Sequence, residues 1–357
     1  MPDARRKHGG TFAMPTSAQS HPPQDEAFIS LRQMIMGFRT TVLVHAAAEL
    51  RLPDLVAQGV NRPEDIAQRL GAPGRMVSRL LRTLVSVGLF DIDAHGGLAL
   101  TARSRLLCGD SRGSLRNTAL FYGNPLVLES YALLSEVVRT GRSAFDLQYG
   151  RSFYDYISES PVLGPVFHDM MTDFTEQELA AVVDAYDFSQ ARRVVDVGGG
   201  HGSLVMVLLK IYPSLSGIVF DLAKPSEDAL AGIRNAQLEA RIAFEAGDFF
   251  QSVPEGGDIY LLKSIIHNWQ DDDAIRILRS ISAAMPPNGR LLVVERIVPQ
   301  GHSASEAKLF DINMMVTAGG LERTEVEHQQ LLANAGLSLT RVVPTRSYMS
   351  LIEASKP

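Results

Sequence analysis

RRVVDVGGGHGSLVMVLLKIYP, which runs from Arg192 to Pro213, joins a strand-like pattern to a helix-like one through a run of glycines. The β-branched apolar run ends at Asp196, and four glycines occupy the five positions that start at Gly198. A strand, a glycine turn and a helix in this order are typical of parallel α/β sheets, where ligands bind at the carboxyl ends of the strands. Glycine lets a ligand approach the main chain closely, so we expect a binding site at this turn.

Strand-like and helix-like segments alternate through the rest of residues 188–357. Further strand candidates are LSGIVFD, ARIAFEA, DIYLLKS, GRLLVVERI, LTRVVPT and YMSLIEA. The alternation predicts a doubly wound, Rossmann-like α/β sheet, and the hairpin formed by the last two segments predicts an antiparallel last strand. The residues T-E-V-E from Thr324 form a capping box, which predicts that a helix begins there.

The N-terminal half has a helical pattern instead. The apolar periodicity of FRTTVLVHAAAELRLPDLVA stops near Pro53, and two short helical patterns then flank the turn Gly71–Gly74. The segment LFDIDAHGGLALT follows as a hairpin, so residues 28–110 are predicted to form a winged-helix module. Residues 111–187 are predicted to be a helical connector rich in aromatic residues and methionines, some of which line a pocket.

A winged helix raises the question of DNA binding. Arg75, Arg79 and Arg82 fall on one face of its second helix, as in a recognition helix. The formal net charge of −6 disfavours general binding to nucleic acid. We therefore keep a DNA-binding regulator only as a less favoured alternative.

The overall composition is that of a soluble globular protein, with 45% hydrophobic and 21% charged residues. Cys108 is the only cysteine, which excludes an internal disulfide and a four-cysteine zinc site and fits a reducing cytoplasm. No apolar run approaches the length of a membrane span. Residues 1–27 contain no apolar core of signal-peptide length and are expected to be a loose tail.

The acidic residues near the glycine turn indicate what kind of ligand it binds. A dinucleotide motif would place a glycine at the position of Ser203, and the carboxylate of Asp196 would repel a pyrophosphate. A positively charged ligand, such as an adenosyl sulfonium, suits Asp196 better. Asp221 follows the second strand and can accept both ribose hydroxyl groups, while Asp248 and Phe249 follow the third strand and can bind adenine.

The motifs VVDVGGGHG, FDL, GDFF, LLKSIIHNWQDDDA, LLVVERIV and GGLERT resemble those of small-molecule O-methyltransferases that use S-adenosylmethionine. This family includes plant caffeate and flavonoid, animal acetylserotonin, and bacterial polyketide and phenazine enzymes. The resemblance extends from about Phe28 to the C-terminus. It implies that the winged-helix module is a dimerisation domain that forms an intertwined homodimer, rather than a module that binds DNA.

The resemblance also assigns ligand contacts. It implies contacts to S-adenosylmethionine at Asp196, Gly198, Gly200, Asp221, Leu222, Gly247, Asp248, Phe249 and Lys263. It implies acceptor contacts at Phe167, Met171, Asn268 and Met314. No metal is expected, because the histidines outside these motifs lack metal-ligand spacing.

His267 is the candidate general base, since it follows the fourth strand within the motif IIHNW. A free histidine has a pKa of about 6.5 and a phenol about 10, so full proton transfer before attack costs roughly 5 kcal/mol. The resemblance implies that Glu295 and Glu322 flank the histidine, where they would orient it and stabilise its charged form. Many family members have aspartate at the position of Asn268, so this chain lacks one charge beside the site.

A second enzyme class uses the same scaffold. Some proteins of this type keep the cofactor but catalyse hydroxylation, decarboxylation or cyclisation with the help of its positive charge. Such proteins usually lack the catalytic base. The presence of His267, Glu295 and Glu322 therefore favours methyl transfer to a phenolic or otherwise hydroxylated aromatic metabolite.

Overall fold

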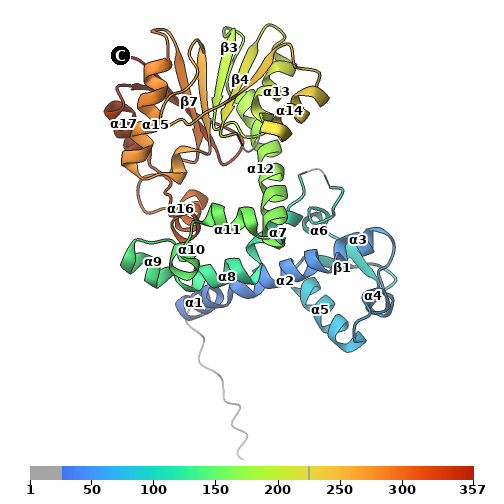
Figure 1. Ribbon diagram of the computed structural model, residues 1–357. Helices are drawn as coiled ribbons and strands as arrows, with labels where there is room; N and C mark the ends of the chain where they lie inside the picture. Colours follow the sequence, from blue (N-terminus) through green and yellow to red (C-terminus); the bar gives the residue numbers. More distant parts are fainter. Residues whose placement is uncertain (1–25, 112, 224–225) are drawn as a thin grey trace, which may run out of the picture.

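The computed structural model describes residues 26–111, 113–223 and 226–357. An α/β domain lies above a layer of helices, and the long helix α12 (Leu163–Ala185) runs between them (Figure 1). The predicted tail lies outside the described residues except for Glu26 and Ala27, which begin helix α1 (Glu26–Met36).

The α/β domain is built on one sheet of seven strands in the order β5-β4-β3-β6-β7-β9-β8. Its strands are β3 (Arg193–Val197), β4 (Ser216–Asp221), β5 (Ile242–Ala246), β6 (Ile259–Lys263), β7 (Arg290–Glu295), β8 (Ser338–Pro344) and β9 (Ser350–Ser355). The first five pair in parallel, and β9 lies antiparallel between β7 and β8. The predicted doubly wound sheet with an antiparallel last strand is confirmed.

Helices cover both faces of this sheet (Figure 1). Those of the domain are α13 (Ser203–Ile211), α14 (Ser226–Asn235), α15 (Asp271–Ala284), α16 (Glu306–Thr317) and α17 (Glu325–Asn334), with a short 3₁₀ turn, η1 (Ile266–Asn268). Alternate residues of β3 enter opposite cores: Val194 packs with α12 and α13, and Val195 packs with α15 and α17. The predicted capping box is confirmed, because the side chains of Thr324 and Glu327 accept from each other's main-chain N–H groups.

The N-terminal part forms the predicted winged helix. It contains α2 (Phe38–Glu49), α3 (Leu52–Ala57), α4 (Pro63–Leu70), α5 (Gly74–Ser86), β1 (Phe90–Ile92), β2 (Leu98–Leu100) and α6 (Ala102–Arg105). The helical pattern expected to stop near Pro53 is interrupted between Glu49 and Leu52, and Pro53 is in the first turn of α3, where a missing N–H costs no hydrogen bond. Arg75, Arg79 and Arg82 are all exposed on α5.

The connector is helical, as expected, and has its own core. Its helices before α12 are α7 (Arg116–Tyr122), α8 (Pro125–Ala132), α9 (Leu134–Thr140), α10 (Ala144–Tyr149) and α11 (Phe153–Glu159). Aromatic rings of α7, α10, α11 and α12 meet largely edge to face, among them Phe121, Phe145 and Phe153. This cluster lies beneath the carboxyl ends of the parallel strands, where the candidate site is found (Figure 1).

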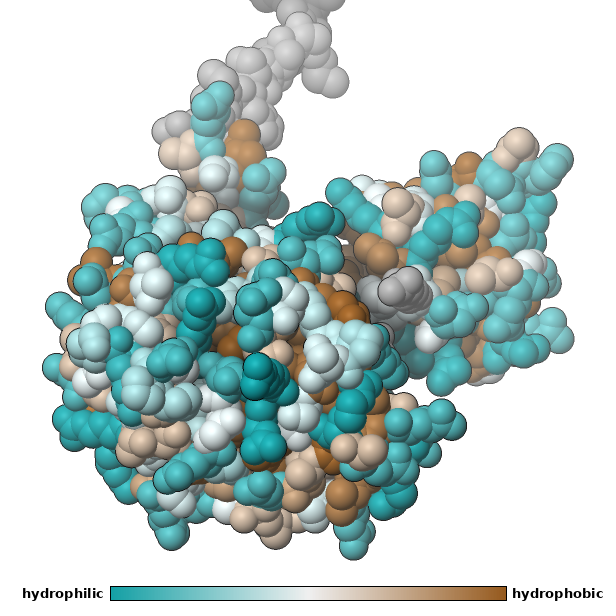
Figure 2. All heavy atoms as spheres, turned by 90° about the horizontal axis from the view of Figure 1, so that it is seen from above, coloured by the Kyte–Doolittle hydropathy of each residue, from teal (hydrophilic) through white to brown (hydrophobic). Residues whose placement is uncertain are grey.

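Seen from above, the surface is mostly hydrophilic with scattered hydrophobic residues, and the winged-helix part protrudes as a separate lobe (Figure 2). None of the helices in the described part of the chain combines the length and the apolar character that a membrane crossing requires.

Candidate functional site

The glycine turn opens into a cavity of about 850 Å³, which we call the glycine-turn cavity. It lies at the carboxyl ends of β3 and β6, the two strands between which the order of the sheet reverses. This is the position where open α/β sheets bind their ligands. Of the predicted cofactor contacts, Asp196, Gly198, Gly200 and Lys263 line this cavity.

The glycines of the turn are needed for two different reasons. Gly198, Gly200 and Gly202 have φ angles of +74°, +54° and +75°, which side-chain-bearing residues rarely adopt. A Cβ at Gly198 would also overlap the side chain of Ile265, whereas a Cβ at Gly200 would have nothing within 4 Å. The main chain at Gly200 therefore faces open space and is accessible to a ligand.

Asp196 is a buried acid without a partner. It is 3% exposed, lines the glycine-turn cavity, and its carboxylate makes no hydrogen bond or ion pair within the described residues. Burial raises its pKa to about 7, with Lys263 opposing the shift and Asp221 adding to it. A positively charged ligand in the cavity would supply the missing partner.

Asp221 and Lys263 are already engaged with other residues. Oδ2 of Asp221 accepts from the N–H of Gly200 at 2.8 Å, and Oδ1 accepts from its neighbour Leu222 at 2.7 Å. Each carboxylate oxygen retains a second acceptor position, so Asp221 can still bind hydroxyl groups. Nζ of Lys263 lies 2.8 Å from Oε2 of Glu178, which reaches the site from α12.

The other predicted cofactor contacts lie beside the cavity and not on its lining. Leu222 is 60% exposed, and Phe249 lies 3.8 Å from the position of a Cβ at Gly198. Asp248 accepts from the N–H of Phe250 at 2.9 Å. Gly247 has a packing role, because a Cβ there would overlap the ring of Phe220.

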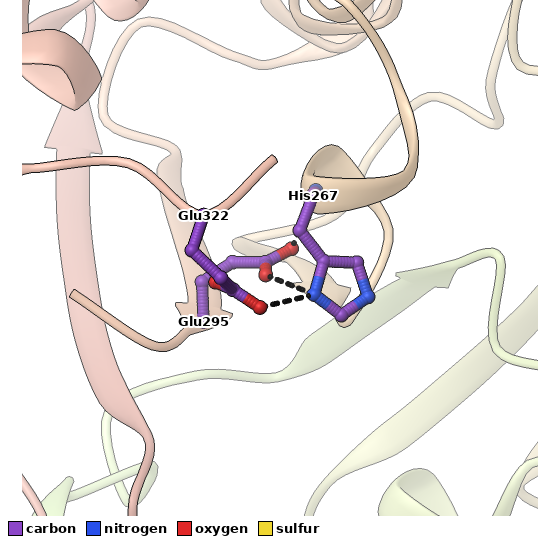
Figure 3. A group of neighbouring side chains, drawn as sticks. All are labelled: His267, Glu295 and Glu322. Carbon is purple, nitrogen blue, oxygen red and sulfur yellow. Dashed lines mark hydrogen bonds and ion pairs between the residues drawn. The ribbon is translucent and has the colours of Figure 1, made fainter. Parts of the chain in front are cut away.

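The predicted catalytic residues come together from three separate segments (Figure 3). Nδ1 of His267 lies 2.8 Å from Oε1 of Glu322 and 3.2 Å from Oε2 of Glu295. The other oxygen of Glu295 accepts from the N–H groups of Ile265 and His267, at 3.1 and 3.3 Å. Glu295 therefore hydrogen-bonds the main chain of the turn that carries the ring, and its other oxygen lies at ion-pair distance from the ring.

The two carboxylates set the charge of the imidazole. Burial lowers the pKa of His267, but Glu295 and Glu322 together outweigh burial and hold this pKa above the ordinary value of 6.5. Burial likewise raises the pKa of Glu295, an effect that His267 opposes. Because Nδ1 faces both acids, the free ring nitrogen is Nε2, which points away from them (Figure 3).

A buried arginine fastens the η1 turn to the loop that carries Glu322. The guanidinium of Arg323, which is 2% exposed, donates to the carbonyl oxygens of Ile266 and Trp269 at 3.2 and 2.8 Å. It also donates to Oδ1 of Asp271 at 2.7 Å. In addition, the N–H of Leu321 donates to the carbonyl of His267. The η1 turn and the loop that carries Glu322 are therefore held together by several hydrogen bonds.

A second, smaller cavity shares the lining residues Met171 and Ser264 with the first, and we call it the aromatic cavity. Its volume is about 60 Å³, and the predicted acceptor contacts Phe167, Met171 and Met314 line it together with His267. Further lining residues that sequence reasoning missed are Glu178, Arg296 and Asn313, each of them buried. Met171 and Ser264 line both cavities, so they mark where the two approach each other.

Asn268, the remaining predicted acceptor contact, is not part of the cavity lining. Its Oδ1 accepts from the hydroxyl of Tyr154 at 2.7 Å, and its Nδ2 donates to the carbonyl of Ser264 at 3.1 Å. Ser264 has a φ angle of +56°, a conformation that is strained for a residue with a side chain. Asn268 thus links helix α11 to the strained residue between the cavities.

Sequence signals existed for some of the missed residues. Arg296 and Arg323 directly follow the predicted glutamates in VVERIV and GGLERT, so both were present in the motifs but without an assigned role. Glu178 lies within a long helical pattern in which nothing distinguishes a buried acid from a surface one.

Comparison with known proteins identifies two matching families. The chain matches the family described as the O-methyltransferase domain over residues 131–338, and the O-methyltransferase dimerisation domain over residues 32–110. A curated relative, phenazine O-methyltransferase PhzM of Lysobacter antibioticus, is 37% identical over 327 residues, which cover 91% of this chain and 95% of the relative.

Solved structures have the same architecture. The mitomycin 7-O-methyltransferase MmcR has a TM-score of 0.84 at 33% identity, over 93% of this chain and 98% of its own. The O-methyltransferase NcsB1 from neocarzinostatin biosynthesis, in complex with S-adenosylmethionine and 2-hydroxy-5-methyl naphthoic acid, has a TM-score of 0.76 at 33% identity, over 89% and 96% of the two chains. One similar relative has a different reaction in its name: aclacinomycin 10-hydroxylase RdmB of Streptomyces purpurascens is 33% identical, over 91% of this chain and 89% of the relative.

Proposed function

The chain belongs to the O-methyltransferase family and is an S-adenosylmethionine-dependent methyltransferase, and from this premise we propose its acceptor class and catalytic residues. We propose that the acceptor is a hydroxyl group of a small aromatic secondary metabolite. His267 is the general base, and Glu295 and Glu322 orient it. The observation that carries this proposal is the position of His267 on the lining of the aromatic cavity, with Nδ1 bound to two buried carboxylates.

The residues of the glycine-turn cavity fit S-adenosylmethionine. Asp196 offers an unpaired buried carboxylate to a cation, and Gly200 leaves the main chain open to a ligand. Asp221 has acceptor positions for ribose hydroxyl groups. The exposed side chain of the adjacent Leu222 and the ring of Phe249, which lies near Gly198, offer apolar surfaces for adenine. When bound, S-adenosylmethionine supplies an electrophilic methyl group on a positively charged sulfur.

His267 removes the acceptor proton at Nε2. The hydrogen bond from Nδ1–H to Glu322 fixes the tautomer in which Nε2 carries the lone pair. As Nε2 takes up the proton, the two carboxylates stabilise the imidazolium. This lowers the free energy of proton transfer, which is unfavourable because a phenol has a higher pKa than histidine. The aromatic lining excludes water and holds the acceptor ring in a fixed orientation.

The match to the dimerisation domain supports a homodimer as the assembly. Helices α1 and α2 expose large apolar side chains that a second copy would cover, among them Phe28, Leu31, Met34, Ile35 and Phe38. We further propose that the enzyme acts in the cytoplasm, on the ground that its single cysteine fits a reducing compartment.

The second candidate is non-methylating chemistry on the same scaffold, which the similarity to aclacinomycin 10-hydroxylase RdmB supports. The two candidates differ in the fate of the methyl group. Incubation with methyl-labelled S-adenosylmethionine and a panel of hydroxylated naphthoic acids and phenols distinguishes them. Label in the aromatic product supports methyl transfer, whereas product formation with unconsumed cofactor supports the second candidate.

The role of His267 is tested in the same assay. His267→Ala should reduce turnover by about 100- to 10,000-fold, the usual contribution of a general base, while the affinity for S-adenosylhomocysteine changes little. His302→Ala, which alters an exposed loop histidine, is the control. Full activity of the His267 variant would remove this residue from the mechanism. Asp221→Ala should show the opposite pattern, with weakened cofactor binding in calorimetry.

A further inference from the structure

Arg296 is a buried arginine on the lining of the aromatic cavity. It directly follows strand β7, its side chain is 9% exposed, and its guanidinium carbon lies 3.7 Å from the centre of the ring of Phe310. This stacking fixes the plane of the guanidinium group but uses none of its N–H donors.

The donors of Arg296 lack a close partner. Within the described residues Arg296 makes no side-chain hydrogen bond, and the nearest carboxylate oxygen, Oε1 of Glu178, is 3.9 Å from Nη2. The other oxygen of Glu178 lies 2.8 Å from Nζ of Lys263, so this acid is shared between two cations. A buried guanidinium without hydrogen bonds is costly, which indicates that its partner is a bound molecule.

A second donor faces the same cavity. Asn313 on α16 is 9% exposed, and its Oδ1 accepts from the hydroxyl of Tyr131 at 2.8 Å. Its Nδ2 has no hydrogen-bond acceptor in the described part of the chain. The aromatic cavity therefore contains two buried side chains with available N–H groups in a lining that is otherwise largely aromatic and apolar.

We propose that Arg296, assisted by Asn313, forms an anion subsite that binds a carboxylate group on the acceptor. The preferred acceptors are then hydroxylated aromatic carboxylic acids, with the ring in the aromatic cavity and the hydroxyl group at His267. The planar guanidinium can bind both oxygens of a carboxylate, which fixes the acceptor in orientation as well as in position. This inference rests on the proposed function, because it names the acceptor class of the same site.

The cavity must widen to admit such an acid. Its volume of about 60 Å³ is well below the range of about 300–1,000 Å³ that is usual for small-molecule sites. Its lining includes Met170, Met171 and Met314, whose unbranched side chains change rotamer readily. The rigid parts of the site, Arg296 stacked on Phe310 and His267 held by its glutamates, can stay in place while the methionines move.

The test measures binding to the full-length enzyme saturated with S-adenosylhomocysteine. The probes are hydroxylated benzoic and naphthoic acids, including 1,4-dihydroxy-2-naphthoic acid, each compared by calorimetry with its neutral carboxamide. Acids that bind the wild type should exceed their carboxamides in affinity by about 10- to 100-fold, the range expected for hydrogen bonds to a charged partner. Arg296→Gln should abolish this preference, because it lowers the affinity for the acids much more than the affinity for the carboxamides.

Two further variants make the result interpretable. Arg139→Gln, at an exposed position on α9, should keep the full preference for acids. Arg296→Lys keeps the charge without the planar fork and should retain part of the preference, and it replaces Arg296→Gln if that variant fails to fold. The inference is overturned if no acid binds more tightly than its carboxamide, or if the Arg296 variants keep the wild-type preference.

The same acids are then assayed with methyl-labelled S-adenosylmethionine. An acid preference that depends on Arg296, without any methyl transfer, would retain the subsite and reject the proposed function. Methylation of neutral phenols without a preference for acids would support the proposed function and reject the anion subsite.

Discussion

Gly320 lies directly against the main chain of His267, so closely that a Cβ at position 320 would overlap the carbonyl oxygen of His267. The neighbouring N–H of Leu321 donates to that same carbonyl at 2.9 Å. The segment GGLERT therefore does more than supply Glu322, because its glycine allows the chain to pass close enough to hold the η1 turn.

Gly320→Ala should displace this turn and the imidazole with it. We expect a loss of about 100-fold in kcat/KM, the scale of a misplacement by roughly 1 Å, with little change in the affinity for S-adenosylhomocysteine. Steady-state kinetics and calorimetry check the two halves of this prediction. Gly74→Ala, where an added Cβ has nothing within 4 Å, is the matched control. Wild-type kinetics for Gly320→Ala would show that the close contact is not needed.

The raised pKa of His267 predicts the pH at which kcat/KM falls on acidification. The base acts as neutral imidazole, so activity should fall with decreasing pH around a midpoint above 6.5. Glu322→Gln removes one of the two carboxylates that raise this pKa, so the midpoint should move to lower pH. A midpoint that does not move in Glu322→Gln would mean that the fall in activity reports another group.

The same shift has a consequence for stability. A pKa raised in the folded state means that the charged imidazole stabilises the fold most below pH 6.5, and that this contribution is lost as the pH rises through the raised value. The difference in unfolding free energy between wild type and His267→Gln should therefore decrease from pH 6 to pH 9. A constant difference in denaturant titrations would contradict this.

Asp196 should release a proton when the cofactor binds. With a pKa of about 7, the carboxyl is half protonated at neutral pH, and a cationic ligand favours its ionised form. Calorimetry of S-adenosylmethionine binding at pH 7, in buffers with different ionisation enthalpies, should detect about half a proton released. Asp196→Asn should bind the cofactor more weakly and release none. Equal release by both proteins would assign the proton to another group.

Tyr154 and Asn268 should behave as one unit. The hydroxyl of Tyr154 donates to Asn268 at 2.7 Å, and Asn268 in turn donates to the carbonyl of Ser264, the residue with the strained backbone. Tyr154→Phe and Asn268→Ala should each reduce kcat/KM, and the double variant should lose little more than the more damaging single one. Additive losses in this cycle would show that the two residues act independently. Asn268→Asp should keep the bond to Tyr154 but lose the donor to Ser264.

Chelation should not affect the reaction. His267, Glu295 and Glu322 bring their potential ligand atoms within 4.8 Å of one another, a grouping that could also hold a metal ion. The hydrogen bond of Nδ1 to Glu322 and the main-chain bonds to Glu295 instead favour a protein-only arrangement. Activity should persist after dialysis against a chelator, and loss of activity that zinc or magnesium restores would refute this expectation.

The sheet and its ligand-binding edge could be predicted because local patterns determine them. Each predicted strand is present, since β-branched runs such as that of β3 are bounded by glycines and acids that mark the strand ends. The sequence patterns did not predict the order of the strands in the sheet, because that order depends on how the helices between the strands pack. The helical pattern expected to stop near Pro53 is interrupted slightly earlier, after Glu49, because Pro53 belongs to the first turn of α3.

The network around the site could be predicted only in part. His267, Glu295 and Glu322 were expected together because they lie in motifs, and the structure brings them into contact. Glu178 was missed because its partners Lys263 and Arg296 are far from it in sequence. Pairing of this kind depends on how α12 packs against the sheet, and helical periodicity carries no information about that.

The placement of α12 has a further consequence. One side of the helix supplies His168, Thr172 and Thr175 to the glycine-turn cavity, another supplies Phe167, Met170 and Phe174 to the aromatic cavity, and Met171 reaches both. An acceptor that pushes this helix aside must alter the space left for the donor. If the acceptor displaces α12, the two ligands bind cooperatively, and each then changes the dissociation constant of the other by the same factor.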